Sequence, residues 1–534
     1  MFGFHRRQRS LIPVKDLGKY EKVAVIEEEE LSDDLDLEMA EDIHRDVKNL
    51  TWIYVVFLAE AIMASSLQPQ LQMLIAGQDT CGNLSTSYLR SILDCAYAFG
   101  GTAGILWGWL SDRVGRRPVA LAGLFGMSIC CLSMGFATNL VACAIFRFAA
   151  GVVSSSVVVA TLTMLGDLSL SPAERARNVA RLPLVAICGS IGPLVQHMVT
   201  GSIDAHGAVW EKYPILSSQI ACGSLVFTIA VIAVFTLKET LPQQSSAPVI
   251  DDEDCENAAF LGQTLSNRDD TPEIPSIRVV DFTATRPEPI PILQFLQAPC
   301  FIVLICSFSL LSLHASTFDV LLPHLGHSST SHGGMGLPCD YLGLILLAVR
   351  AVAGVIILHA VPKAVEKMGL LRPFRSASLL FPALYVVTPL LALVVMCSGT
   401  LTAVISTMAI LVKHSLAGGA QVLVALLMLN AAPDAFSAGT VIGLMQFASL
   451  FKALAVGVSG ASFYLSNDFS IAATNYGLWT AMAVLGGVGA GLAWFVRERP
   501  SVERDFPSEV LCWETCFDAE GDMLVALGGS DDAI

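Results

Sequence analysis

Ionisable side chains lie within stretches of this sequence that are otherwise apolar. A charge at the centre of a bilayer costs about 2.5–3.5 kcal/mol on insertion scales, so each such residue needs a functional or structural reason. The chemistry open to groups of this kind is proton uptake and release beside a cavity. The residues concerned are Glu60, Asp94, Arg147, Asp319, Arg350, Lys413 and Lys452.

Glu60 is the candidate for a proton acceptor. Ala64 and Gln68 follow it at i+4 and i+8, which places a small and polar stripe on one helix face. Burial favours the protonated form of a carboxyl group and a nearby cation favours the ionised form, so the two effects can balance near neutral pH. We expect Arg147 or another cavity cation to modulate that balance. The alternative for both residues is a buried structural hydrogen bond.

The other carboxylates and Lys413 have alternatives of their own. Arg90 lies four residues before Asp94, so a local ion pair on one helix face would explain this acid. Asp319 stands near the outer end of its apolar run and could belong to a gate. Lys413 could extend its ammonium to the membrane surface.

A loop between two apolar runs contains the most specific motif, since residues 108–118 read GWLSDRVGRRP. Gly108 allows close helix packing, and Gly115 permits a tight turn. Asp112 can face a helix N-terminus or a neighbouring cation. From average composition, the pattern arises by chance on the order of once per several thousand chains of this length. The positions that define it are Gly108, Asp112, Arg113, Gly115, Arg116 and Arg117.

A second loop repeats part of this pattern. Residues 362–372 read PKAVEKMGLLR, where Glu366, Lys367 and Gly369 repeat the acid, base and glycine of the first loop at the same spacing. Equivalent loops in the two halves of a chain indicate an internal duplication.

Composition identifies the elements that must position these residues. Hydrophobic residues make up 54% of the 534 and charged residues only 15%, whereas soluble domains have roughly 25% charged residues. Apolar runs of spanning length, about 20 residues, recur along the chain. They lie near 51–74, 89–110, 118–137, 140–166, 179–201, 216–237, 299–322, 341–361, 374–397, 402–429, 438–464 and 474–496. We therefore predict an all-α membrane protein with twelve transmembrane helices in two six-helix, pseudo-symmetric domains.

The hydrophilic segments divide the chain and account for most of its net charge of −16. They are acidic and lack a basic face, which argues against a nucleic-acid partner. The first apolar run follows about fifty residues that include Glu27–Glu30, which is unlike a cleavable signal peptide. We predict a disordered acidic tail at 1–50, a six-helix domain at 51–238, a disordered linker at 239–298, a second six-helix domain at 299–497 and a tail at 498–534.

Lysine and arginine are concentrated in one set of loops, which predicts that these loops, the linker and both termini are cytoplasmic. Asn83-Leu-Ser85 lies in a loop on the opposite side and is a predicted glycosylation site, whereas the sequon at Asn49 should stay unmodified. Residues 7–12, RQRSLI, look like a basic dileucine sorting signal. We expect a vacuolar or plasma-membrane location.

Residues 108–118 resemble the signature loop of the major facilitator superfamily. Arg147-Phe-Ala-Ala-Gly151 resembles that family's R-x-x-x-G element. Gly192-Pro193 resembles the core of its antiporter motif, although Gln196 and His197 stand where paired glycines are usual. That departure argues against drug antiport.

The second half is similar to fungal relatives of the zinc-induced facilitator-like group, a branch that resembles drug:proton antiporters. The similar segments are 318–323, 333–337, 368–372, 429–433 and 439–443. The resemblance covers about residues 50–498. It implies two six-helix domains around a central cavity, alternating access and proton coupling.

Histidine and cysteine provide no metal site in this interpretation. His324, His327 and His332 are placed in a flexible outer loop, with loose spacing for zinc, and His314 lies just inside the seventh run. Cys81 and Cys339 fall in non-cytoplasmic loops and could form a disulfide. We expect neither a metal nor a cofactor.

Together these features predict a secondary transporter that moves a small solute by alternating access, with proton-coupled export or vacuolar sequestration. The expected partners are the solute, protons and the lipid bilayer, and we expect a monomer. No nucleotide-binding loop or nucleophile–base constellation indicates an enzyme. The alternatives are an uncoupled facilitator of the same fold and a transporter-like receptor that binds solute without moving it.

Overall fold

The computed structural model divides into two compact units, residues 1–52 and 53–534. In the first unit, residues 47–52 are described and are helical. Several predicted features, namely Asn83, Gly192, Pro193, Cys81 and Cys339, lie outside the described residues. The described residues are 47–66, 86–169, 171–190, 213, 215–241, 292–337, 342–394, 399–465, 471–496, 515–517 and 523–525.

Among the described residues, ten helices are long and apolar enough to cross a membrane, judged by length and composition. Nine of them are Val47–Ser66, α5 (Arg116–Gly135), α6 (Leu140–Leu168), α10 (Leu216–Thr236), α13 (Pro299–His327), α14 (Leu342–Met368), α15 (Leu371–Val394), α16 (Gly399–Ala431) and α19 (Ile471–Phe495). The tenth, Ala435–Ser459, consists of η6 (Ala435–Ser437), α17 (Ala438–Met445) and the start of α18 (Ala448–Leu465).

The two remaining predicted spans are also helical where they are described. One is α3 (Thr86–Gly100), η3 (Gly101–Ala103) and α4 (Gly104–Val114), and the other is helical at residues 182–190. The twelve predicted positions are thus occupied by helices, which supports the predicted all-α, two-half layout. We call residues 53–241 the first half and 292–496 the second half.

Short elements complete the described chain. They are α7 (Pro172–Ala180), α12 (Ile292–Gln297), η4 (Thr330–His332), β1 (Thr515–Phe517) and β2 (Met523–Val525). The two strands pair antiparallel, with Cys516 opposite Leu524. This hairpin was not predicted from the sequence.

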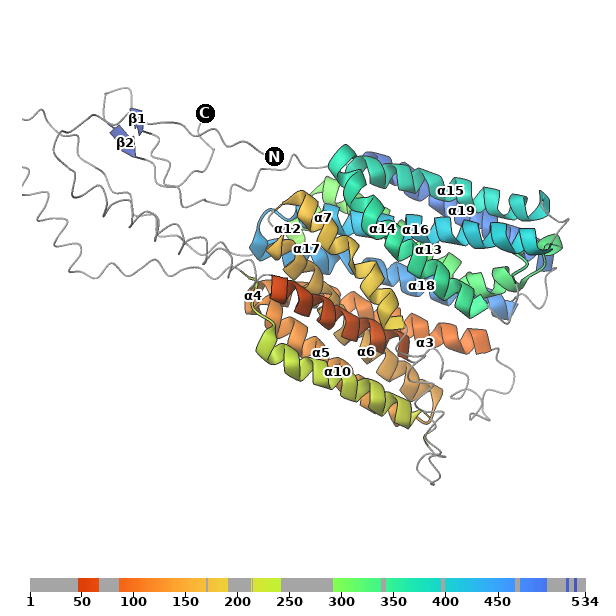
Figure 1. The fold of residues 1–534 in the computed structure, drawn as a ribbon, viewed down its shortest axis with the longest axis horizontal. Coiled ribbons are helices and arrows are strands. Elements are labelled where there is room, and N and C mark those ends of the chain that lie inside the picture. The colour runs from red at the N-terminus through yellow and green to blue at the C-terminus, as the bar shows by residue number, and fades with distance from the viewer. Residues whose placement is uncertain are drawn as a thin grey trace, which may run out of the picture. The chain divides into compact units, whose positions relative to one another are not determined.

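Neighbouring helices pack within each half and across the two halves. In the first half α5 lies between α6 and α10, and in the second half α15 lies beside α19 (Figure 1). The halves meet where α4 packs on α17 and α3 packs on α18. The loop motif at the end of α4 is therefore placed against the opposite half.

Glycines allow the closest of these contacts. A Cβ atom at Gly151 of α6 would lie 2.1 Å from the Tyr97 carbonyl oxygen of α3. A Cβ atom at Gly108 of α4 would lie 2.2 Å from the Gly439 carbonyl oxygen of α17. Each helix pair thus touches backbone to backbone, which confirms the predicted packing role of Gly108.

The turn glycines of the duplicated loops also agree with the sequence. Gly115 has φ +119° and Gly369 has φ +75°. L-residues rarely adopt these conformations, so both positions require glycine. The two loops therefore share a backbone feature as well as a sequence pattern.

The predicted end of the seventh span was wrong. We placed His324 and His327 in an outer loop because the seventh apolar run ends near residue 322. Instead α13 continues through Pro323 to His327. The backbone amide and the hydroxyl of Ser328 both donate to the His324 carbonyl, at 3.0 and 2.8 Å, and so close the last turn.

We predict that Gly151→Ala destabilises the protein and that Gly487→Ala does not. Overpacking a close contact costs about 1–3 kcal/mol. A Cβ atom at Gly487 meets nothing within 4 Å, and there alanine gains about 1 kcal/mol of helix propensity. Thermal unfolding of the detergent-purified protein should show a lower Tm for Gly151→Ala and an equal or higher Tm for Gly487→Ala. Equal Tm values for wild type and Gly151→Ala would contradict the close packing of α3 on α6.

Candidate functional site

A cavity of about 550 Å³ lies between the two halves. From the first half it is lined by Phe57 and Glu60 of the first span, by α3, η3, α6 and the end of α7, and by residues 182–190. From the second half it is lined by α13, α14, α16, α17 and α18. Its volume is in the range of small-molecule sites, about 300–1,000 Å³. The acidic, basic and histidine side chains that line it are Glu60, Asp319, Arg350, Lys413, His414 and Lys452. Five of the seven predicted intramembrane residues therefore meet at one cavity.

Glu60 is held by neutral hydroxyl groups. The Ser154 hydroxyl donates to Glu60 Oε1 at 2.6 Å. The Tyr97 hydroxyl lies 3.1 Å from the same oxygen and 2.8 Å from Ser154 Oγ. Glu60 is 8% exposed, and among the described residues no cation forms an ion pair with it. The sequence did not indicate Tyr97 or Ser154 as partners.

Arg147 and Asp94 lie beside this group without lining the cavity. The Arg147 guanidinium stacks 4.3 Å from the centre of the Tyr97 ring and donates to the Ala64 carbonyl at 2.9 Å. Asp94 is 3.8 Å from Arg147 and 3.6 Å from Arg90. The predicted local pair of Arg90 and Asp94 is thus present. Arg147 of α6 therefore contacts both α3 and the first span, beside the Tyr97 ring whose hydroxyl contacts Glu60.

Asp319 and Lys413 form an ion pair in the second half. The Lys413 ammonium bonds to the Asp319 carboxylate and to the Ala315 carbonyl, the latter at 3.2 Å. It also lies 4.4 Å from the centre of the Phe318 ring. Lys413 is 1% exposed, so it does not extend to the membrane surface. His414 Nε2 is 3.7 Å from the same carboxylate.

Arg350 and Lys452 line the cavity without a polar partner. Within the described part of the chain, neither side chain has an ion pair or a hydrogen bond. Lys452 lies in electrostatic range of Glu60 and Asp319. Both cations therefore face the cavity with their donors available.

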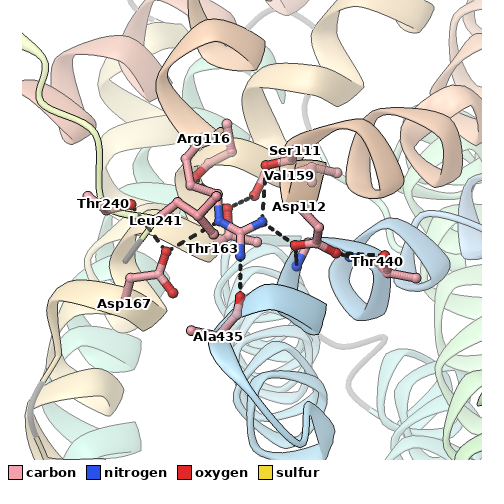
Figure 2. Close-up of polar contacts among 12 residues, drawn as sticks. Ser111, Asp112, Arg116, Val159, Thr163, Asp167, Thr240, Leu241, Ala435 and Thr440 are labelled. Atoms are coloured by element: carbon pink, nitrogen blue, oxygen red, sulfur yellow. Dashed lines mark hydrogen bonds and ion pairs between the residues drawn. The ribbon is translucent and has the colours of Figure 1, made fainter. Parts of the chain in front are cut away.

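The signature loop forms a buried polar contact between the two halves, at Asp112. This carboxylate accepts bonds from the Gly439 and Thr440 amides, at 2.8 and 2.6 Å, and from the Thr440 hydroxyl at 2.6 Å (Figure 2). These amides belong to the first turn of α17, where the helix dipole favours an anion. The predicted contact of Asp112 with a helix N-terminus or a cation is confirmed on both counts, because it also bonds to Arg116.

Arg116 connects this contact to the rest of the first half. Its guanidinium lies 3.4 Å from Asp167 and 3.2 Å from Ser111, and donates across to the Ala435 carbonyl at 2.5 Å (Figure 2). Arg116 is 0% exposed. A fully buried guanidinium requires such partners, since an unpaired buried charge is strongly unfavourable.

Glu239 and Thr240 complete the group, which we call the loop cluster: Asp112, Arg116, Asp167, Glu239, Thr240 and Thr440. Glu239 accepts the backbone amides of Arg116 and Arg117 at 2.8 and 3.1 Å, and the Thr240 hydroxyl donates to Asp167 at 3.1 Å. We had assigned residues 239 and 240 to the linker. Their capping role could have been suspected from the start of α5, which has no acidic residue in its first turn and no side-chain cap of its own. The first amides of such a helix need an acceptor from elsewhere in the chain.

The second duplicated loop makes a weaker contact between the halves. Arg177 of α7 bonds to Glu366 at 2.8 Å, with side chains 61% and 41% exposed. Exposed ion pairs contribute about 0–1 kcal/mol. Arg175 adds a bond to Asn430 at 2.9 Å. The acids of the two loops thus both contact the opposite half, but only Asp112 does so in a buried setting.

The side chains of the remaining predicted residues have other partners. Arg113 stacks on Trp109 at 4.2 Å, and Arg117 bonds to the Val234 carbonyl. His324 lies 3.2 Å from Asn475, and His314 lies 3.0 Å from the Tyr385 hydroxyl. Among the described residues, no group of three or more histidine, cysteine or acidic side chains could hold a metal ion.

Comparison with known proteins agrees with this geometry. The family model of the Major Facilitator Superfamily matches residues 49–457. The chain is 25% identical over 474 residues to the Major facilitator superfamily multidrug transporter mfsB of Aspergillus fumigatus, covering 78% of each chain.

Solved structures show the same fold. The human organic anion transporter MFSD10 (TETRAN) has a TM-score of 0.58 at 16% identity, covering 84% of this chain and 99% of that one. The proton:xylose symporter XylE has a TM-score of 0.58 at 15% identity, covering 85% and 97%. The chain therefore belongs to the major facilitator superfamily and is an integral, multi-pass membrane transporter rather than an enzyme.

Proposed function

We propose that this protein is a proton-coupled secondary transporter that moves a small organic solute out of the cytoplasm or into a vacuole by alternating access. The observation that supports this most directly is Glu60, a buried carboxyl group that lines a solute-sized cavity between the two halves. Similarity to the efflux pump azaK of Aspergillus niger, 27% identical over 144 residues, supports the outward direction.

Glu60 is better suited to proton exchange than Asp319. Its hydrogen-bond partners are the hydroxyls of Tyr97 and Ser154, so it can be held in either protonation state. Asp319 is bonded to the Lys413 ammonium, which favours its ionised form. We assign the proton to Glu60 and a structural ion pair to Asp319 and Lys413.

Arg147 is proposed to modulate Glu60 through the ring between them. The Tyr97 hydroxyl contacts Glu60 while its ring face contacts the Arg147 guanidinium. A change in the charge of Glu60 would alter the hydrogen bond of Tyr97 and, through its ring, the contacts of Arg147 with Asp94 and Ala64. This arrangement connects protonation to the packing of the helix 47–66, α3 and α6.

The loop cluster is proposed to be the gate at the cytoplasmic end. Asp112 and Arg116 join α4 and α5 of the first half to the start of α17 in the second half. Alternating access requires the halves to separate at one end while they close at the other. Separation at this end must break the contacts of Asp112 with α17.

We predict that Glu60→Gln abolishes solute accumulation driven by a proton gradient while retaining part of the solute counterflow. Glutamine preserves the shape and a hydrogen-bond acceptor but cannot exchange a proton. Flux into proteoliposomes, with and without a pH gradient, measures both activities.

Asp319→Asn is the comparison for this test, because it changes a cavity carboxylate that we assign no proton. If Glu60→Gln keeps gradient-driven accumulation with unchanged pH dependence, then Glu60 is structural, and Asp94 and Asp319 become the candidates. If the wild-type flux is the same with and without a pH gradient, the protein is an uncoupled facilitator. If no flux is measured, it is a receptor.

We predict that Asp112→Asn slows transport at least tenfold, whereas Glu366→Gln changes it less than twofold. Removing one charge of a buried pair destabilises the folded contact by about 3–5 kcal/mol, whereas an exposed pair contributes about 0–1 kcal/mol to stability. Asp112 and Glu366 occupy equivalent positions of the duplicated loops, so the second variant is a matched control. Initial rates should be compared at equal amounts of reconstituted protein. Equal rates for wild type and Asp112→Asn would remove the proposed gate.

A further inference from the structure

The cavity contains more positive than negative charge. Its charged lining has three cations, Arg350, Lys413 and Lys452, and two carboxylates, Glu60 and Asp319. Lys413 and Asp319 neutralise each other through their ion pair. Arg350 and Lys452 then remain, with Glu60 as the other ionisable group. The net charge of these three residues is +1 when Glu60 is ionised and +2 when it is protonated.

The two remaining cations have no polar partner in the described protein. Neither Arg350 nor Lys452 has a hydrogen bond or an ion pair there. Elsewhere in the second half, the buried ammonium of Lys413 is satisfied by a carboxylate, a carbonyl and an aromatic ring. Arg350 is exposed and Lys452 is half-buried at the cavity, so the donors of both side chains are open to a ligand there, and an anion would offset the cost of placing two cations within a membrane domain.

Lys452 is placed at the cavity by a break in its transmembrane segment. The helix is interrupted between α17 and α18, and Ala448, Ser449 and Lys452 of the first turns of α18 all line the cavity. The Ser449 amide already donates to the Gln446 carbonyl at 2.9 Å. Recognition of a charged ligand here therefore depends on side chains, and the positive end of the α18 dipole reinforces Lys452.

We propose that the transported solute is an organic anion whose carboxylate, or a similar oxyanion, binds Arg350 and Lys452. This proposal rests on the transport function proposed above and specifies its substrate class. Phe57, Val158 and Phe308 line the same cavity and would contact an apolar body. A cationic solute fits less well, because Asp319 is already neutralised and Lys452 lies in electrostatic range of Glu60.

The charge of such a solute agrees with the proposed direction. The cytoplasmic side of a plasma or vacuolar membrane is electrically negative relative to the other side. The transmembrane potential therefore favours movement of an anion out of the cytoplasm. Export of an anion thus draws on the electrical gradient.

The test measures binding to the detergent-purified full-length protein with three probes of matched shape: 2-naphthoate, 2-naphthamide and 2-(aminomethyl)naphthalene. We expect 2-naphthoate to bind and to raise the thermal unfolding temperature, and the amide and the amine to bind at least tenfold more weakly. Loss of a charge-assisted contact weakens binding roughly ten- to hundredfold, which is the effect expected for Lys452→Gln and for Arg350→Gln. Lys452→Arg should stay within a few-fold of wild type.

Lys363→Gln and Arg372→Gln are matched controls, because both side chains are exposed and neither lines the cavity. They should bind 2-naphthoate as wild type does. The proposal is overturned if 2-naphthoate fails to bind, if the amide or amine binds equally well, or if the Lys452→Gln/Arg350→Gln double variant retains wild-type affinity.

The outcomes also separate this proposal from the transport function. If proteoliposomes transport the amide or the amine but not 2-naphthoate, the transport function is supported and the anion site is overturned. Binding of 2-naphthoate that depends on both cations, without any flux, would keep the anion site and overturn the transport function.

Discussion

The buried contact of the Asp112 carboxylate with Arg116 and with the first amides of α17 joins the two halves of the molecule. Asp112 and Arg116 are 2% and 0% exposed, so each charge depends on the other for its stability. Gly108 permits this contact, because its lack of a side chain lets α4 reach the backbone of α17. Since α17 leads directly to the helix break beside Lys452, the same contact constrains the wall of the cavity.

The two halves share a loop pattern, with glycine in a positive-φ conformation at Gly115 and Gly369, but they differ in the chemistry that they bring to the cavity. Glu60 of the first half is held by hydroxyls, whereas Asp319 of the second half is neutralised by Lys413. The proposed proton site therefore belongs to the first half, and the proposed anion site, Arg350 and Lys452, belongs to the second. A solute between them would contact both halves, so its binding and the charge of Glu60 would act on the same interface.

The helices could be predicted from hydropathy, because the length of an apolar run is a local property of the sequence. The internal repeat could be predicted from the acid–base–glycine pattern that recurs in the two loops, which is also local. The cost of a charge in an apolar span also predicted Glu60, Asp319, Arg350, Lys413 and Lys452 as cavity residues. Their partners were not predictable, since Tyr97 and Ser154 meet Glu60 only through the packing of α3 and α6 against the first span. Likewise, Glu239 caps α5 only because the chain returns to that helix after α10. The end of α13 depends on the bond from the Ser328 hydroxyl to the His324 carbonyl, and hydropathy carries no signal for that bond.

The most direct test of this account is a distance measurement across the end that contains the loop cluster. Spin labels can be placed at Val114 and Met368, two exposed and equivalent positions of the duplicated loops, through a genetically encoded residue that leaves the fourteen native cysteines unchanged. In reconstituted protein, we expect two distance populations, a short one with the loop cluster intact and a longer one with it broken. Their ratio should change with pH. A single distance at every pH, in protein that actively transports solute, would contradict a gate at this end.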